Sequence, residues 1–325
     1  TFQKSASLVL LRAIGPSSAS DALRESKALA KQTDGHRGEV RFAVFSQDGQ
    51  RLFSAGEDNM VILWDPETGQ KIRTLQGHAG PITSIAESPD RRQLLTASED
   101  NTARIWDVQT GQALLSLEAH TDRLVSAIYS PDGDTIATLS HDGTVRLWQP
   151  KRRPHVRIAA HNDWVRSAVF SPVPGQRFVL SASADGTGRI WDLQSGLLRL
   201  ELRGHPEWVN SAAYSRDGRF IVTASMDHTA RVWNAESGRL LATLQGHGDW
   251  IRSAAFSPNG EMIVTASKDK TARIWSGPQW QKWTALVGHD GAVASAVFSS
   301  DGKEVLTASE DQTARRFRVS DGVEL

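Results

Sequence analysis

The sequence predicts an all-β protein, a seven-bladed propeller preceded by a short N-terminal helical segment, and three observations support this prediction. The phrase from Leu95 to Trp106 recurs in close copies, such as Val222 to Trp233. A histidine that usually follows glycine precedes each copy, and successive histidines lie about 42 residues apart. Each period holds four short strand-like segments. Four short strands cannot bury both faces of their sheet, so neighbouring units are expected to stack and close radially.

Composition is compatible with a globular fold. The chain has 325 residues, of which 39% are hydrophobic and 23% charged. Lysine plus arginine and aspartate plus glutamate each number 37, so no global field attracts the protein to nucleic acid or an anionic membrane. We therefore expect charge-based recognition to be local.

The chain has no cysteine. This excludes disulfides, thiol catalysis and cysteine-based zinc sites, and it fits the reducing cytoplasm, where we expect the protein to be located. The sequence shows no signal peptide and no apolar run long enough to cross a membrane. The first residue is threonine, so we expect a fragment or a processed chain.

Residues 1–30 carry no repeat and are predicted to form a helical or linker segment. A short apolar run from Ser7 to Ile14 is stopped by a glycine-proline pair. Ala19 to Ala30 reads as a second helix, because good helix formers follow Ser18 and Asp21 in capping-box spacing. The alternative for this segment is a partly ordered linker.

The propeller is predicted to occupy residues 31–325. Its seven marker histidines are His36, His78, His120, His161, His205, His247 and His289. In the second unit the predicted strands are Pro81 to Ala86, Gln93 to Ser98, Thr102 to Trp106 and Ala113 to Leu117. For the last unit, either the segment from Val323 to Leu325 or the segment from Ala28 to Thr33 could supply the fourth strand, and we favour the N-terminal one.

The Gly-His pair, the turn aspartate and the Trp-Asp pair at this spacing resemble WD40 repeats, over about nine tenths of the chain. The resemblance implies one network of aspartate, histidine, hydroxyl and tryptophan per blade. The implied aspartates are Asp58, Asp100, Asp142, Asp185, Asp227, Asp269 and Asp311. The hydroxyls are those of Ser54, Thr96, Thr138, Ser181, Thr223, Thr265 and Thr307, and the tryptophans are Trp64, Trp106, Trp148, Trp191, Trp233 and Trp275. Phe317 stands in the seventh tryptophan position and lacks the indole N–H, a loss of about 1 kcal/mol.

These repeated polar residues could be mistaken for hydrolase triads. Seven identical sites, each tied to a core tryptophan, are better explained as buried networks that fix the strands, and we predict no catalytic residue, metal or cofactor. A ladder of arginines two positions before the aromatic is expected to pair or stack on neighbouring blades. Of the two tryptophans ahead of the last marker histidine, Trp283 is predicted in the core and Trp280 at an exposed edge.

Function is expected where the repeats differ, at the positions that WD40 propellers present around their central channel. Units four to six place an arc of Trp164, Trp208 and Trp250 there. Arg123, Arg166, Asn210, Arg252 and Lys268 interleave with or flank this arc, Arg41 joins them from the first unit, and Glu57, Glu99 and Glu310 are expected opposite. Large aromatics beside arginine are typical of binding hot spots. The alternative is that recently duplicated repeats keep tryptophans that merely cover one another.

We therefore expect a non-enzymatic module that binds a protein or peptide, with neither nucleic acid nor membrane as partner. Near-identical repeats behind a leucine-rich segment also resemble the C-terminal sensor arrays of bacterial signalling ATPases of the NACHT class; the residues concerned are Leu11-Arg12-Ala13 and Ala22-Leu23-Arg24. This resemblance implies a sensor attached to an effector domain absent from this chain. The alternative is a free-standing scaffold that assembles a multiprotein complex.

Overall fold

A computed structural model describes residues 35–325 except 151 and 160. Within this part of the chain the backbone forms 27 strands and one 3-10 turn. The strands pair into seven sheets in which neighbouring strands are also neighbours in sequence. This confirms the predicted fold class, an all-β seven-bladed propeller. The helices predicted within residues 1–30 lie outside the described residues.

The first sheet consists of β1 (Val40–Phe45), β2 (Leu52–Gly56), β3 (Val61–Trp64) and β4 (Lys71–Leu75). The second consists of β5 (Ile82–Glu87), β6 (Gln93–Ser98), β7 (Thr102–Asp107) and β8 (Ala113–Glu118). The third consists of β9 (Leu124–Tyr129), β10 (Ile136–Ser140), β11 (Thr144–Gln149) and β12 (Arg152–Ala159). The four strands of the second sheet lie within one residue of the bounds predicted from the sequence.

The fourth sheet consists of β13 (Val165–Phe170), β14 (Phe178–Ser183), β15 (Thr187–Asp192) and β16 (Leu198–Arg203). The fifth consists of β17 (Val209–Tyr214), β18 (Phe220–Ser225), β19 (Thr229–Asn234) and β20 (Leu240–Gln245). The sixth consists of β21 (Ile251–Phe256), β22 (Ile263–Ser267), β23 (Ala272–Ser276) and β24 (Lys282–Leu286), with the turn η1 (Pro278–Trp280) before β24. The seventh consists of β25 (Val293–Phe298), β26 (Glu304–Ser309) and β27 (Ala314–Arg318).

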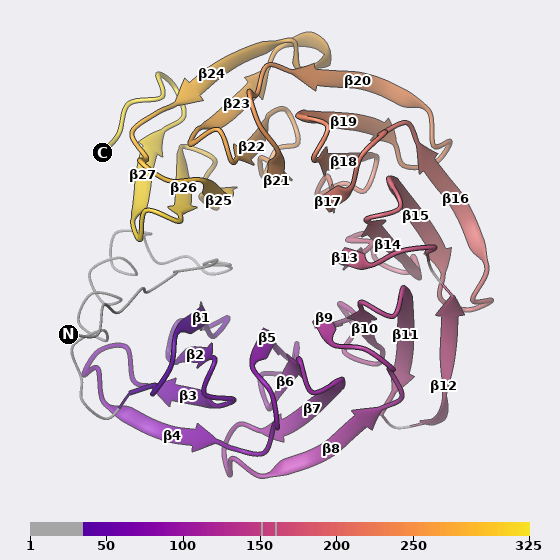
Figure 1. The fold of residues 1–325 in the computed structure, drawn as a ribbon, viewed down its shortest axis with the longest axis vertical. Helices are drawn as coiled ribbons and strands as arrows, with labels where there is room; N and C mark the ends of the chain where they lie inside the picture. The colour runs from indigo at the N-terminus through magenta and orange to yellow at the C-terminus, as the bar shows by residue number, and fades with distance from the viewer. Residues whose placement is uncertain (1–34, 151, 160) are drawn as a thin grey trace. The chain divides into compact units, whose positions relative to one another are not determined.

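The chain divides into two compact units. Unit 1 holds the residues up to Asp142 together with Trp148–Pro154, and unit 2 holds Gly143–Leu147 together with His155–Leu325. Within unit 2, the first strands β13, β17, β21 and β25 lie along one edge, and the fourth strands β16, β20 and β24 lie along the other (Figure 1). Within unit 1, β1, β5 and β9 likewise lie opposite β4 and β8 (Figure 1).

The turn after each repeated aspartate has the same backbone conformation in all seven sheets. The residue that follows the aspartate has a positive φ each time; these residues are Asn59, Asn101, Gly143, Gly186, His228, Lys270 and Gln312. In the fifth sheet the Asp227 carboxylate accepts a hydrogen bond from the Thr229 N–H at 2.9 Å and thereby closes the turn. Side-chain closure of this kind explains why the chain tolerates left-handed residues other than glycine there.

Adjacent sheets bury their apolar faces against each other. In unit 2, Val222 and Val232 of the fifth sheet belong to one buried cluster with Ile251 and Ile263 of the sixth. First strands of neighbouring sheets are also joined by a hydrogen bond in which a serine hydroxyl accepts from a backbone N–H. The pairs are Ser84 with Ala127 at 2.9 Å, Ser167 with Ala212 at 3.2 Å, and Ser211 with Ala254 at 3.2 Å. The repeats therefore stack in register, as their spacing predicts.

The seventh sheet has three strands in the described part of the chain. Phe317 of β27 forms an isolated antiparallel bridge with Glu324, and the Leu325 N–H donates to the Arg316 carbonyl at 2.8 Å. The segment from Val323 to Leu325 thus begins the fourth-strand position, which was one of the two predicted alternatives and not the favoured one. Pairing of the segment from Ala28 to Thr33 in this place remains a prediction, because that segment lies outside the described residues.

The predictions for the two tryptophans before the last marker histidine are wrong in both cases. Trp283 is 47% exposed, whereas Trp280 packs against the buried cluster of the fifth and sixth sheets. Trp283 does take the place of Leu241 one repeat earlier, but that position points outward, since Leu241 is itself 36% exposed. The turn η1 directs Trp280 inward, where its ring meets Phe220 edge-on at 5.5 Å.

Candidate functional site: a tryptophan and arginine surface

Each sheet contains a buried polar network, which lies next to the loop that leads into its first strand. In the fifth sheet the His205 Nδ1 lies 2.7 Å from the Asp227 carboxylate, and its Nε2 lies 2.8 Å from the Thr223 hydroxyl. The same hydroxyl accepts the Trp233 indole N–H at 2.9 Å. Equivalent contacts of 2.7–2.9 Å occur in the other sheets, and in the seventh Phe317 supplies no indole donor. The network implied by the WD40 resemblance is therefore confirmed.

The electrostatics of the networks suit a structural role. Burial alone would raise the pKa of Asp227, but hydrogen bonds from His205 and Thr229 outweigh it and lower that pKa to about 2. Burial lowers the pKa of His161 and His247 below the ordinary value of 6.5. Each hydroxyl is buried and already bonded on both sides, so it is not available to attack a substrate.

The arginine ladder makes structural pairs, in keeping with one of the two predicted roles, and the pairs described here lie within the arginine's own repeat. Arg189 pairs with Glu201 at 2.9 Å in the fourth sheet, and Arg315 pairs with Glu324 at 2.8 Å in the seventh. Other members lie against the glycine before the marker histidine; a Cβ on Gly77 would approach the Arg104 Nη1 to 2.9 Å. These arginine side chains occupy the space beside the glycine of the Gly-His pair. A side chain on that glycine would therefore collide with them.

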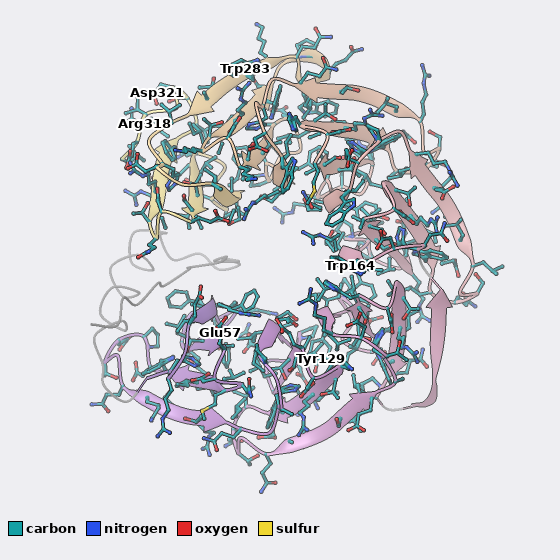
Figure 2. The ribbon with its side chains drawn as sticks, in the orientation of Figure 1. Glu57, Tyr129, Trp164, Trp283, Arg318 and Asp321 are labelled. Atoms are coloured by element: carbon teal, nitrogen blue, oxygen red, sulfur yellow. The ribbon has the colours of Figure 1, made fainter. Side chains whose placement is uncertain are left out.

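The predicted tryptophans lie just ahead of three successive first strands of unit 2. Trp164 precedes β13, Trp208 precedes β17 and Trp250 precedes β21. Figure 2 shows Trp164 near the first strands of this unit. Trp164 and Trp208 meet edge-on with ring centres 5.7 Å apart, and both are partly exposed. Trp250 is 38% exposed.

Cations lie beside two of these rings. The Arg166 guanidinium lies 5.6 Å from the centre of the Trp208 ring, and the Lys268 ammonium lies 4.1 Å from that of Trp250. Both distances are within the range of cation–π attraction, which also holds the long side chains in place. The structure thus brings together aromatic and basic residues that lie apart in the sequence, 42 positions for Arg166 and Trp208 and 18 positions for Trp250 and Lys268.

Other predicted residues of unit 2 make structural contacts. Arg252 pairs with Glu310 at 2.7 Å, so Glu310 lies with the basic residues and not apart from them as expected. The Asn210 amide donates to the Ile251 carbonyl at 2.8 Å and accepts a long 3.4 Å hydrogen bond from Arg166. Asn210 therefore ties β17 to β21 and positions Arg166.

Sequence reasoning missed the acidic residue before each tryptophan. The Asp163 carboxylate accepts the Trp164 N–H at 2.7 Å, and the Asp249 carboxylate accepts the Trp250 N–H at 2.7 Å. Glu207 holds the same position before Trp208. The three parallel phrases could have revealed these residues, which fix the loops and add negative charge next to the cations.

The predicted residues of unit 1 are paired among themselves. Arg41 donates to Glu99 at 2.6 Å and to Glu57 at 3.0 Å. These hydrogen bonds raise the pKa of Arg41 despite its partial burial, which acts in the opposite direction. Arg123 donates through Nε to the His141 ring at 2.9 Å. In Figure 2 Glu57 lies near β1 and β2.

In the described part of the chain, no helix has the length and apolar character needed to cross a membrane.

Comparisons with known proteins agree with this architecture. The family pattern "WD domain, G-beta repeat" matches seven segments: residues 28–65, 69–107, 111–149, 152–192, 196–234, 238–276 and 280–317. Ribosome assembly protein 4 of Chaetomium thermophilum is 41% identical over 63 residues, which are 19% of this chain and 12% of that protein. WD repeat and SOCS box-containing protein 1 of Homo sapiens is 41% identical over 63 residues, 19% of this chain and 15% of that protein. Small ribosomal subunit protein RACK1y of Oryza sativa subsp. japonica is 40% identical over 58 residues, 18% of this chain and 17% of that protein.

The chain therefore spans less than a fifth of each of these relatives in the matched region. The family match, in contrast, extends over most of the chain. WD40 propellers are typically non-enzymatic modules that bind proteins and serve in interaction and scaffolding. The chain belongs to the WD40 repeat family.

Proposed function

We propose that this chain binds a segment of a protein partner on unit 2, at a surface formed by Trp164, Trp208, Trp250, Arg166 and Arg252, here called the Trp/Arg surface. The observation that carries the proposal is the partial exposure of three tryptophans in successive loops, with Trp250 38% exposed. Tryptophan and arginine are the residues most enriched at binding hot spots. Contiguous exposed aromatics on a soluble domain are characteristic of interaction sites.

The surface offers flat apolar rings beside charges of both signs. Arg166 lies against Trp208, Lys268 lies over Trp250, and Glu310 is paired with Arg252. A peptide with one large apolar side chain and mixed charges fits this arrangement, because the rings supply buried area while the charges set the orientation. Asn210 serves as a positioning residue, since its amide is held by Ile251.

The alternative that duplicated tryptophans merely cover one another accounts for only part of the arrangement. It applies to Trp164 and Trp208, whose rings meet edge-on. Trp250 contacts Lys268 and remains 38% exposed. Covering by another tryptophan therefore does not account for Trp250, and its exposed area favours a partner as its cover.

The paired charges of unit 1 have a secondary place in the proposal. Arg41 is shared between the carboxylates of Glu57 and Glu99, and Arg123 is hydrogen-bonded to His141. These paired charges form a polar surface on unit 1 itself, where they contribute more to the choice of partner than to affinity.

The experiment has three steps. The intact protein is used to capture partners, and the captured protein is identified. Its affinity for the parent protein and for the variants is then measured by titration. Trp208→Ala and a Trp164/Trp208/Trp250 triple alanine variant should each weaken binding at least about tenfold, the usual effect of losing a hot-spot tryptophan. Their melting temperatures should stay close to that of the parent, since these side chains lie at the surface.

Leu198→Ala is the matched control, because Leu198 is 45% exposed on β16 of the same unit, away from the loops of the Trp/Arg surface. It should leave partner capture unchanged. A large fall in melting temperature of Trp208→Ala together with unchanged capture would refute the proposal and assign the tryptophans to the scaffold.

We further propose that the propeller acts as a sensor within a larger, cytoplasmic signalling protein, attached to an effector domain. The support is the leucine-rich N-terminal sequence around Leu11 and Leu23, which lies outside the described residues, together with the absence of cysteine. The sequence of the full-length gene product tests this point. An effector domain ahead of Thr1 supports a sensor, and a free-standing propeller supports a scaffold.

A further inference from the structure

The turn between β23 and β24 breaks the repeat. In the fifth sheet the side-chain Oδ1 of Asn234 accepts from the Ser237 N–H at 2.8 Å and closes the corresponding turn. In the sixth sheet the chain reads Ser276-Gly277-Pro278-Gln279-Trp280-Gln281, which lacks both of these residues. A turn that differs from the turn at the same place in the other repeats is a candidate for a function of its own.

Two consecutive residues of this turn have left-handed backbone conformations. Gln279 has a φ of 55° and Trp280 a φ of 53°. Left-handed residues other than glycine are uncommon, and two in succession store strain that must be offset by what the turn positions. The strained residues place Trp280 inward, where it meets Phe220 and Phe256 edge-on.

The turn forms one end of a pocket of about 270 Å³ between β20 and β24. Leu241, Thr243 and Gln245 of β20 contribute to one wall, while Gln279, Gln281 and Trp283 contribute to the other. None of these side chains carries a charge. In Figure 1 β20 and β24 lie along the edge of unit 2 opposite β17 and β21, and Figure 2 shows Trp283 on β24.

The pocket combines an exposed ring with exposed amide groups. Trp283 is 47% exposed, and the Arg273 guanidinium lies 4.0 Å from its ring centre, which fixes the ring in position. Trp280 also lines the pocket, but its indole N–H is closed off from solvent and does not face a ligand. The hydrogen-bonding groups open to a ligand include the side-chain amides of Gln279 and Gln281, which are both exposed.

We propose that this pocket, here called the β20–β24 pocket, binds an extended, uncharged, proline-rich peptide. Proline rings are apolar and lack charge, in keeping with a lining of tryptophan, leucine, threonine and glutamine. A polyproline II segment has no internal hydrogen bonds, so its carbonyl oxygens are free to accept from the glutamine amides of the pocket. Grooves lined by aromatic side chains recognise such segments at low entropic cost, because the peptide is already extended.

The test is titration of the protein, labelled with ¹⁵N at its indole nitrogens, with acetylated and amidated decaproline. The chain has 11 tryptophans, each with its own indole signal. The signals of Trp280 and Trp283 should shift, and those of Trp164, Trp208 and Trp250 should not. Trp283→Ala should weaken binding at least about tenfold without changing the melting temperature, since its ring is exposed.

Leu198→Ala is the matched control, because Leu198 is 45% exposed on the equivalent strand β16. It should bind decaproline like the parent, and so should Trp208→Ala, which separates this site from the Trp/Arg surface. The proposal is overturned if decaproline at millimolar concentration shifts neither indole, or if Trp283→Ala binds as tightly as Leu198→Ala. A shift caused by maltoheptaose and not by decaproline would overturn it in favour of a carbohydrate site.

Discussion

At the residue scale, one buried hydroxyl per sheet connects three neighbours. Thr223 accepts the Trp233 indole N–H at 2.9 Å and lies 2.8 Å from the His205 ring, while the other side of that ring meets Asp227. Each polar atom of the network has a partner, which removes the cost of burying it. The seven networks thus hold the strands without creating a reactive group.

Trp233→Phe is expected to lower the free energy of unfolding by about 1 kcal/mol, because the ring still packs but the hydrogen bond to Thr223 is lost. Urea denaturation measures this change. In a Thr223→Val background the same replacement should cost much less, since the acceptor is already absent. Equal costs in both backgrounds would show that the indole N–H does not contribute and that the effect comes from packing.

Acid is expected to destabilise the fold in two steps. Burial lowers the pKa of His161 and His247 from 6.5, so the unfolded chain binds more protons and stability falls as the pH drops below about 6.5. For Asp227, hydrogen bonds from His205 and Thr229 override burial and lower the pKa from 3.8 to about 2. The stability it contributes is present above pH 3.8 and is lost toward pH 2. Denaturant titrations at pH 7, 5 and 3 should show a progressive decrease, and a constant midpoint would contradict the linkage.

At the scale of the elements, the link between a fourth strand and the next marker histidine depends on a glycine. Gly246 has a φ of 150°, and a Cβ there would collide with the Arg273 guanidinium, which is itself stacked on Trp283. The link therefore couples three features of the repeat: the turn into the next sheet, the arginine ladder and the outer strand.

Gly246→Ala is expected to destabilise the protein by about 1–3 kcal/mol, through backbone strain and displacement of Arg273. Thermal or urea denaturation measures the change. Gly248→Ala is the control two positions on, because its Cβ would meet nothing closer than the Asp269 Cβ at 3.9 Å. If both variants lost the same stability, the cost would reflect a general intolerance of the loop and not the arginine contact.

At the scale of the whole molecule, equal numbers of acidic and basic residues leave recognition to local surfaces. We propose two such surfaces in unit 2, on different strands. The Trp/Arg surface lies at the loops before β13, β17 and β21, and the β20–β24 pocket lies along fourth strands. Both arise where individual repeats depart from the shared sequence, while the shared residues build the sheets.

The fold could be predicted almost completely from the sequence, because each repeat carries its own register. The strands from Gln93 to Ser98 and from Thr102 onward lie where periodicity places them. The partners of surface charges could not be predicted in the same way. Glu310 was expected opposite the arginines, yet its carboxylate lies 2.7 Å from Arg252, because side-chain reach between neighbouring sheets is not encoded in repeat position.

The sequence by itself determined the number of sheets and their strand order, since these follow from local periodicity. Its resemblance to WD40 repeats implied the buried hydrogen-bond networks, which satisfy polar groups that would be costly to bury alone. Only the tertiary structure decided which aromatic side chains are buried. Trp280 and Trp283 stand three residues apart, yet the strained turn between β23 and β24 directs the first inward, where it is partly buried, and leaves the second 47% exposed. That outcome depends on the space between adjacent sheets, which is fixed only once the repeats have packed together.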